Sequence, residues 1–415
     1  MDDKLIKLSA EAEIALKDTF AKFDEVSFYN TQKVLDVFRE ERVSEGLFAG
    51  SCGYGYDDRG RETLDRIFAK VFGKQAALVR HGLISGTHAL STALFGLLRP
   101  GDVLLSVTGK PYDTIDEVIG IRDNGKCDGS LKDFGVSYKQ IELSPDGNID
   151  IPSVIKEVEK NKNVKVLYIQ RSKGYLDRPT LSCSQIDSFY AEIKKHTDAY
   201  VFVDNCYGEF VERKEPDADV LVGSLIKNPG GGMAETGAYI AGSERAIELI
   251  SYRYTSVGIG SEAGATLNTL KSMYKGFFYA PHTVCQALKT AVFASYIFEK
   301  LGYETNPKSE ESRFDIIQAI KLGSADKLCA FCRGIQSGSP VDSYVTPEPW
   351  DMPGYSDPVI MAAGTFTQGS SIELSADGPL RPPYIAFFQG GLTFESGKIG
   401  ILSAAQQITE LEKAR

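Results

Sequence analysis

Two early segments of the chain carry side chains that could bind a phosphorylated, flat ligand. The turn SGTH (residues 85–88) separates the apolar run AALV from a helix-like segment, so its backbone N–H groups and hydroxyls could bind an anion. The segment YDT (residues 112–114) follows the apolar run DVLLSV, where Tyr112 could lie against a planar ring. Each has a simpler alternative: an ordinary helix cap at the turn, and core packing of the tyrosine.

A carboxylate and a lysine follow, each near the end of a further apolar run. Asp204 lies in YVFVDN, where burial is costly unless a proton or a positive charge pairs with the carboxylate. Lys227 lies in SLIKNPGGG after the run ADVLVGS, and a desolvated lysine beside a hydroxyl and a glycine-rich loop can act as a nucleophile. The simpler alternatives are an Asp that caps a loop and a solvated Lys.

The order of these four features predicts a site for pyridoxal 5′-phosphate (PLP), held as a Schiff base on Lys227. The phosphate turn comes first, then the aromatic side chain, then Asp204, then Lys227. A protonated pyridine nitrogen would pair with Asp204 in a charge-assisted hydrogen bond worth about 1.5–3 kcal/mol and would make the ring an electron sink. Other nucleotide motifs are incomplete, since GYGYDDRG follows no strand and TGKP and SGKI lack the upstream glycine of a P-loop.

The segments between these residues predict an α/β fold. From about residue 61, helix-like segments alternate with short runs that are apolar throughout: AALV, DVLLSV, VKVLYIQ, YVFVDN, ADVLVGS and GAYIAG. Strands buried on both faces and separated by helices are typical of a mostly parallel sheet. Two helices are expected in the first 40 residues, before a Gly- and Tyr-rich loop.

The order of helix-like and strand-like segments changes beyond about residue 281. Long helical patterns come first, followed by the strand-like runs VIMAAGTF, SSIEL and YIAFF and by a final helix. We therefore expect three parts: N-terminal helices and an arm over residues 1–60, a large PLP-binding domain over residues 61–285, and a small α+β domain over residues 286–415.

Composition and charge exclude several classes of protein. The 415 residues include 56 acidic and 46 basic side chains, a net charge of -10, and no dense basic run, so a nucleic-acid partner is not expected. No apolar stretch approaches the roughly 20 residues that cross a bilayer, so we expect no membrane association and a cytoplasmic location. Neither the four histidines nor the CAFC pair at residues 329–332 has a second ligand pair at suitable spacing, and no metal site is expected.

The chain resembles a family of PLP-dependent enzymes over nearly its whole length. The segments GYGYDDRGRETLD, HGLISGTHA, VDNCYGEF, SLIKNPGGG and GIGSEAGAT together resemble the methionine γ-lyase-like, or cystathionine β-lyase-like, aluminium-resistance proteins. The resemblance implies the aspartate aminotransferase-like fold of type I PLP enzymes, with a large, mostly parallel seven-stranded sheet. It also implies a carbon–sulfur lyase that performs β- or γ-elimination on a sulfur amino acid such as cystathionine or methionine.

The resemblance also assigns roles to residues on the cofactor. The phosphate would be held by Ser85, Gly86, Thr87 and Ser224, Tyr112 would stack on the ring, Asp204 would bind the ring nitrogen and Lys227 would form the Schiff base. Ile226 stands where the lyases carry a hydroxyl residue, so residues 256–261 of a partner chain could supply one contact.

Further roles concern the neighbouring subunit and the substrate. Tyr56 and Arg59 would reach the phosphate of the partner, although the spacing differs by one residue from the family pattern, so Tyr54 or Arg61 could serve instead. Lys227 would remove the Cα proton, and Tyr112, or Tyr56 from the partner, would protonate the leaving thiol. Arg381 in ADGPLRPPY would bind the substrate carboxylate, unless it is only a surface arginine. A shared site implies a homodimer or a homotetramer.

Three alternatives share these residues. An aminotransferase would use every cofactor residue in the same way. A selenocysteine-synthase-like enzyme shares the fold, but the acidic charge disfavours a tRNA substrate. A non-catalytic, PLP-binding regulatory protein needs neither Lys227 nor Asp204, so the presence of both disfavours it.

Overall fold

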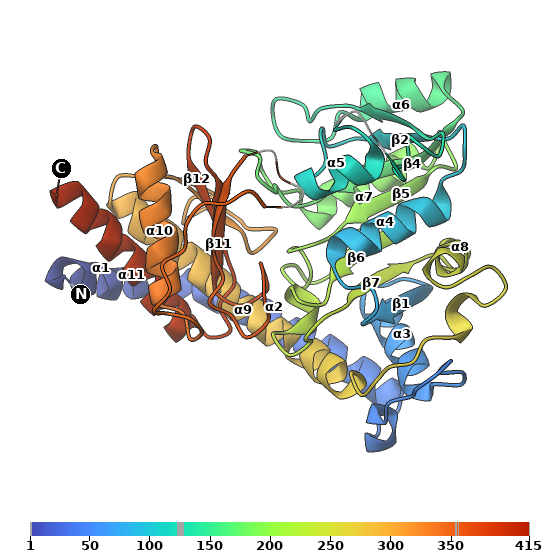
Figure 1. Cartoon of the computed structure of the whole chain (residues 1–415), viewed down its shortest axis with the longest axis horizontal. Coiled ribbons are helices and arrows are strands. Elements are labelled where there is room, and N and C mark those ends of the chain that lie inside the picture. The colour runs from blue at the N-terminus through green and yellow to red at the C-terminus, as the bar shows by residue number, and fades with distance from the viewer. Residues whose placement is uncertain (1, 123–127, 353–354, 356, 415) are drawn as a thin grey trace.

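The chain folds around two separate β-sheets (Figure 1). The computed structural model describes residues 2–122, 128–352, 355 and 357–414. The large sheet has seven strands in the order β1-β7-β6-β5-β4-β2-β3. Its strands are β1 (Ala76–Arg80), β2 (Val103–Ser106), β3 (Ser137–Gln140), β4 (Val164–Gln170), β5 (Tyr200–Asp204), β6 (Val220–Ser224) and β7 (Ala238–Gly242). All neighbours pair in parallel except β7, which is antiparallel to β1 and to β6, so the predicted mostly parallel, seven-stranded sheet is confirmed.

Both faces of the large sheet are buried except at the edge strand β3, which explains why the other strands are largely apolar. Leu104 and Leu105 are consecutive in β2 and therefore point to opposite faces, yet both side chains are fully buried, each in a different core cluster. The helices of this domain are α3 (Arg59–Val71), α4 (Gly86–Leu97), α5 (Asp113–Ile119), α6 (Ile151–Lys160), α7 (Cys183–Ile193) and α8 (Glu244–Tyr254). Side chains cap several of these helices; Ser182 and Gln185, for example, form a capping box at α7.

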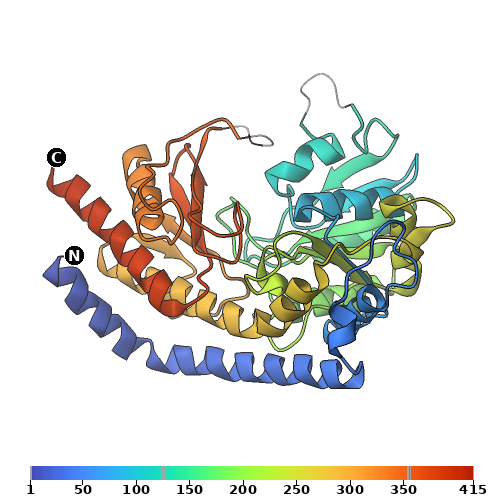
Figure 2. The same cartoon turned by 60° about the horizontal axis from the view of Figure 1, so that its bottom comes forward.

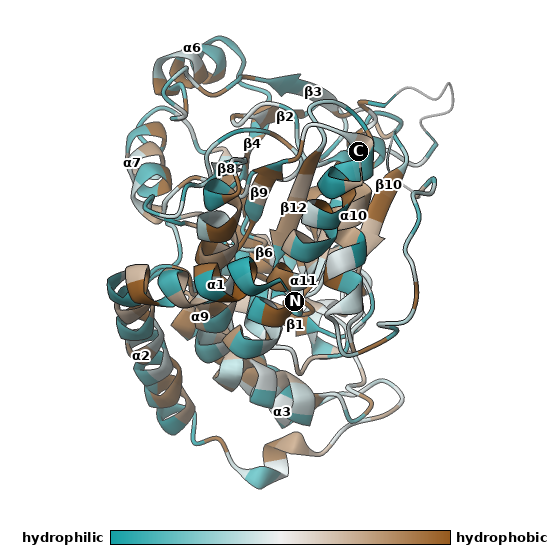
Figure 3. Cartoon of the chain, turned by 90° about the vertical axis from the view of Figure 1, so that its left-hand side faces the viewer, coloured by the Kyte–Doolittle hydropathy of each residue, from teal (hydrophilic) through white to brown (hydrophobic). Residues whose placement is uncertain are grey.

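The small sheet has five antiparallel strands in the order β10-β11-β12-β9-β8. They are β8 (Glu304–Asn306), β9 (Gln318–Lys321), β10 (Val359–Ala362), β11 (Ser375–Pro379) and β12 (Ile385–Gln389), and the helices α10 (Ala325–Ser337) and α11 (Phe394–Lys413) accompany them. Figure 3 shows hydrophobic colour concentrated on β9, β10 and β12.

One predicted strand was wrong, and the strands β3, β8 and β9 were not predicted. The run SSIEL was expected to be a strand, but β11 begins only after it, at Ser375. The backbone of SSIEL instead bonds to the loop that holds Lys227, since the N–H of Ile372 donates to the carbonyl of Ile226 over 2.9 Å. The edge strand β3 was missed because its residues are largely exposed and lack an apolar pattern.

Three helices lie along the two sheets (Figure 2); two of them run past both sheets, whereas the first packs only against the small domain. They are α1 (Asp3–Ala15), α2 (Lys17–Glu40) and the long α9 (Leu270–Lys300), and the two N-terminal helices confirm the sequence prediction. Phe277 of α9 lies in the core of the large domain, whereas Phe293 of the same helix lies in the core of the small one. The expected boundary at residue 285 therefore falls inside a continuous helix. None of the helices among the described residues has the length and apolar character to span a membrane.

Candidate active site

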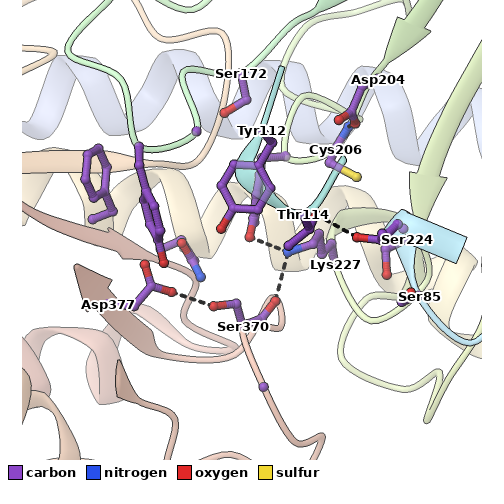
Figure 4. Close-up of a pocket in the computed structure, with 18 of the residues that line it drawn as sticks. Ser85, Tyr112, Thr114, Ser172, Asp204, Cys206, Ser224, Lys227, Ser370 and Asp377 are labelled. Carbon is purple, nitrogen blue, oxygen red and sulfur yellow. Dashed lines mark hydrogen bonds between the residues drawn. The ribbon is translucent and has the colours of Figure 1, made fainter. Parts of the chain in front are cut away.

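A cavity of about 310 Å³ lies at the carboxyl ends of β4, β5 and β6, between the two sheets. Its volume is within the range of small-molecule sites, about 300–1,000 Å³. The cavity brings together seven residues that the sequence predicted for a cofactor: Ser85, Gly86, Thr87, Tyr112, Asp204, Ser224 and Lys227. Figure 4 shows several of them around one space, together with residues of the small domain.

One end of the cavity is suited to a phosphate. Helix α4 begins at Gly86, so its first N–H groups have no partners within the helix and face the cavity together with the hydroxyl of Thr87. Thr87 Oγ1 and Thr114 Oγ1 lie 2.9 Å apart. Ser224 Oγ is buried without a hydrogen-bond partner in the described part of the chain. A phosphate oxygen would satisfy this hydroxyl, and the donors present fit that group.

The glycine at the start of α4, Gly86, leaves room at the end of the cavity that is suited to a phosphate. A Cβ atom added at Gly86 would stand 3.3 Å from Cys206 Sγ and 3.6 Å from the Cβ of Ser224. A larger side chain would therefore press against the wall that carries the buried hydroxyl. Thr114, which the sequence indicated only as a neighbour of Tyr112, belongs to the same group of hydroxyls.

Asp204 provides the charge that a protonated pyridine would need. It is the last residue of β5, and its Oδ1 accepts a hydrogen bond from the N–H of Cys206 over 3.2 Å. Its Oδ2 accepts a longer one, 3.4 Å, from the hydroxyl of Tyr168. Burial raises the pKa of Asp204, and the hydrogen bonds from Cys206 and the charge of Lys227 only partly oppose that rise. A cationic ring N–H would stabilise the carboxylate, so Asp204 also fits PLP.

Lys227 lies in the loop after β6 with its amine at the cavity wall. Its Nζ donates to the carbonyl of Ser370 over 3.0 Å and to the hydroxyl of Tyr207. Burial lowers the pKa of Lys227, although the neighbouring acidic groups Cys206, Asp377 and Asp204 oppose the effect. A lowered pKa makes the neutral amine more available, which is what an amine nucleophile requires.

Tyr112 and a group of unpredicted side chains form the rest of the cavity wall. The hydroxyls of Tyr112 and Tyr355 lie 2.8 Å apart, and burial raises the pKa of Tyr112 well above its usual value. The unpredicted residues on this side include Tyr175, Tyr207, Tyr355, Ser370, Asp377 and Phe387. Most of these come from loops or from the small sheet, where a single sequence gives no pattern that points to the cavity.

The residues expected to reach a partner lie outside the cavity of their own chain. The rings of Tyr54 and Tyr56 stack with centroids 5.4 Å apart, and the two side chains are 72% and 55% exposed. Arg59 is the first residue of α3 and lines a separate surface hollow. Arg61 is buried and donates to the carbonyls of Gly55 and Gly264 over 2.6 and 2.8 Å. Arg61 thereby joins the Tyr-rich loop to the chain that follows residues 256–261.

Arg381, expected on the substrate carboxylate, lies in the turn between β11 and β12. Its Nη1 is 2.7 Å from Asp357 Oδ2, its side chain is 40% exposed, and it lies outside the cavity lining. Ile226 does line the cavity, beside Lys227. Within the described ranges, no group of three or more His, Cys, Asp or Glu side chains is arranged to bind a metal ion.

The chain matches a known protein family and a sequence relative over almost its whole length. The family model described as methionine gamma-lyase matches residues 5–409. The uncharacterized protein YnbB of Bacillus subtilis (strain 168) is 52% identical over 410 residues, which are 98% of this chain and 97% of that protein.

Solved structures with the same architecture include proteins with about half of their residues identical to this chain and one protein that is similar in fold alone. A protein of Clostridium acetobutylicum named as a candidate cystathionine beta-lyase involved in aluminum resistance has 48% identity and a TM-score of 0.94, covering 98% of this chain and 96% of that chain. A carbon-sulfur lyase involved in aluminum resistance from Clostridium novyi NT has 50% identity with the same TM-score and coverage. The PLP-dependent protein YhfS of Escherichia coli, at 14% identity, shares the fold with a TM-score of 0.62 over 94% of this chain and 97% of that chain.

Proposed function

Because this chain belongs to the methionine gamma-lyase family and has the fold of type I PLP-dependent enzymes, we propose that it is a PLP-dependent carbon–sulfur lyase. The proposed reaction is the β- or γ-elimination of a thiol from a sulfur amino acid related to cystathionine or methionine. The observation that carries the proposal is the meeting of Lys227, Asp204 and the start of α4 at one cavity. These three features match the aldehyde, the ring nitrogen and the phosphate of a single cofactor.

Lys227 has two proposed tasks: it attaches the cofactor covalently and, once displaced by the substrate amine, removes the Cα proton. Its lowered pKa favours both, because each step needs the neutral amine. When bound, PLP supplies a protonated ring that withdraws the electrons left at Cα. Asp204 keeps the ring nitrogen protonated, and Ser85, Gly86, Thr87 and Ser224 hold the phosphate.

Tyr112 is the proposed acid for the departing sulfur. It lines the cavity, and burial raises its pKa, so the phenol is protonated when the substrate binds. Tyr56 from a neighbouring subunit is the alternative acid.

We further propose a homodimer or homotetramer with a shared site, working in the cytoplasm. The exposure of Tyr54 and Tyr56 supports the shared site, because large aromatic side chains on a loop are costly to leave in water. The bonds of Arg61 support it as well, since they hold the Tyr-rich loop beside residues 256–261, the other segment expected to reach a partner.

A test of the proposed function combines a spectrum with a product assay. The purified protein is expected to show the visible absorbance of enzyme-bound PLP, and L-cystathionine or L-methionine is expected to release pyruvate or 2-oxobutyrate. A protein that stays colourless with excess PLP would exclude the cofactor. Turnover that requires an added 2-oxo acid would indicate an aminotransferase instead, and binding without any turnover would indicate a non-catalytic PLP-binding protein.

A further inference from the structure

One charged side chain of the cavity has no role in the proposed reaction. Among the described residues that line the cavity, the side chains that ordinarily carry charge are Lys227, Asp204 and Asp377. The first two serve the cofactor. Asp377 is only 4% exposed and lies on β11, where Met361 and Phe387 are its register neighbours on the adjacent strands. All three line the cavity. These side-by-side residues of β10, β11 and β12 form the cavity wall on the side of the small sheet, with Asp377 in the middle.

Asp377 needs a positive partner. Its Oδ2 accepts a hydrogen bond of 2.7 Å from Ser370 Oγ, whereas the buried hydroxyl of Tyr175, which lines the same cavity, has no hydrogen-bond partner among the described residues. Burial nevertheless raises the pKa of Asp377, and among the described residues it is the charge of Lys227 that opposes the rise. In the proposed enzyme that amine is linked to the cofactor, so Lys227 no longer offers a free ammonium group to the buried carboxylate.

A proton relay from Asp377 to Lys227 does not explain the carboxylate. Ser370 contacts Asp377 through its hydroxyl but contacts Lys227 through its backbone carbonyl. A carbonyl oxygen only accepts hydrogen bonds, so a proton cannot pass between the two residues through Ser370. Asp377 lines the cavity beside Ser370, away from Asp204 and Ser224 (Figure 4), which is the side toward which a substrate side chain would extend in the proposed enzyme.

Aromatic rings surround this space. The centroid of Tyr175 lies 5.0 Å from that of Phe387, 5.4 Å from that of Tyr112 and 5.7 Å from that of Tyr355. The faces of such rings attract cations, and the attraction strengthens when the site excludes water. A buried carboxylate inside a group of aromatic rings is the chemistry that recognises an organic ammonium group. The same site would repel a substrate that ends in a carboxylate alone. No arginine that could bind such a carboxylate is among the described residues of the lining.

We propose that Asp377 binds a second ammonium group, at the end of the substrate side chain. The enzyme then prefers thioether amino acids with a distal amine to those of the same length with an apolar end. This inference rests on the proposed function, because it places the α-amino group of the substrate at the cofactor and the side chain toward the small sheet. Asp377 is thus a residue that determines specificity, not one that performs the elimination.

The test uses two pairs of compounds that differ only by an ammonium group in place of a methyl group. L-lysine and L-2-aminoheptanoate have no leaving group, so they report binding to the PLP-loaded protein by titration calorimetry. S-(2-aminoethyl)-L-cysteine and S-propyl-L-cysteine are their eliminable counterparts and report kcat/KM. We expect the amine of each pair to be favoured by about 10- to 100-fold, the value of one hydrogen bond to a charged group.

Two variants separate specificity from folding. Asp377→Asn keeps the size of the side chain and is expected to bring the preference ratio close to one. The matched control is Asp357→Asn, which removes an acidic side chain from the partner of Arg381, outside the cavity, and is expected to keep the wild-type ratio.

The outcomes also separate this inference from the proposed function. Equal binding of the two ligands by the wild type, or an equal loss for both in Asp377→Asn, would overturn the role of Asp377. If the wild type prefers L-lysine to L-2-aminoheptanoate and Asp377→Asn loses that preference, but neither thioether releases a thiol, the inference holds and the proposed elimination fails. If the thioethers are eliminated without any preference, the proposed function holds and the inference fails.

Discussion

Lys227 donates a hydrogen bond of 3.0 Å to the carbonyl of Ser370, across the boundary between the two sheets. Two residues away, the N–H of Ile372 donates to the carbonyl of Ile226, the residue before the lysine. The loop after β6 is thereby tied to the segment that precedes β11. The position of the reactive amine consequently depends on the small sheet as well as on the strand that precedes it, and substitutions near Ser370 can act on the cofactor site.

Replacement of Lys227 by alanine is expected to abolish covalent attachment of the cofactor. Borohydride reduction followed by intact-mass measurement reports this directly, since only a covalent link adds the mass of the cofactor to the chain. Lys110→Ala is the matched control, because Lys110 pairs with Asp113 and Asp116 and its side chain is 41% exposed. Retention of the added mass in Lys227→Ala would show that another lysine is the attachment site.

Asp204→Asn is expected to weaken PLP binding by about 10- to 100-fold, because an amide cannot replace a charge-assisted hydrogen bond to a protonated ring. Titration of the apoprotein with PLP measures the dissociation constant. The control is Asp219→Asn, since Asp219 comes just before β6, at the opposite edge of the same sheet, and pairs with Lys194. Equal losses in the two variants would mean that the effect is on folding rather than on the ring nitrogen.

Ser224→Ala is expected to weaken the binding of PLP but not of pyridoxal, which lacks the phosphate. The buried hydroxyl of Ser224 has no protein partner in the described residues, so in the apoprotein its removal costs little or is stabilising. A loss of a few-fold to about 10-fold in PLP affinity is expected, the value of one ordinary hydrogen bond. Equal losses for the two ligands would argue against a phosphate contact.

A mixture of two inactive variants is expected to recover activity if the site is shared between subunits. In a dimer of one Lys227→Ala chain and one Arg59→Ala chain, one site carries both lesions and the other carries neither. Random reassociation of equal amounts would restore about a quarter of the wild-type sites in a two-fold symmetric dimer. A mixture with no more activity than its components would exclude Arg59 as a contact supplied in trans.

The buried Lys173 predicts a pH dependence of stability. Its Nζ donates to the carbonyl of Asn306 over 3.1 Å, and burial lowers its pKa from 10.5 to about 8. Between these two values the unfolded chain binds more protons than the folded one, so the free energy of unfolding rises with pH across this window.

Comparison with Lys173→Met isolates this effect. The wild type is expected to gain up to about 3 kcal/mol relative to the variant as the pH rises through the window, and urea denaturation at several pH values measures the difference. Other groups that titrate in this range contribute to both proteins and cancel. If the free energy of unfolding changed with pH in the same way in both proteins, the lowered pKa of Lys173 in the folded protein would be contradicted.

The amino-acid sequence determined the fold of the large domain and the residues expected to hold the cofactor. All its strands except the edge strand β3 are buried on both faces and therefore largely apolar, which gives a strong local pattern. Parallel strands also bring their carboxyl ends to one edge, so Asp204 and Lys227 meet the start of α4 by topology alone. Local signals were sufficient because each of these residues lies at the start or end of a regular element or, for Lys227, three residues beyond the end of β6.

Only the tertiary structure decided the side of the cavity that the small sheet forms. The strand β11 consists of SADGP, residues that disfavour strands, and it is extended because β10 and β12 pair with it. Asp377 faces the cavity because of that register and because of how the small sheet lies against the large one. Arg381, four residues later, is turned toward Asp357 instead. Pairing between distant strands leaves no periodic trace in a single sequence, so no local pattern could have distinguished these two charges.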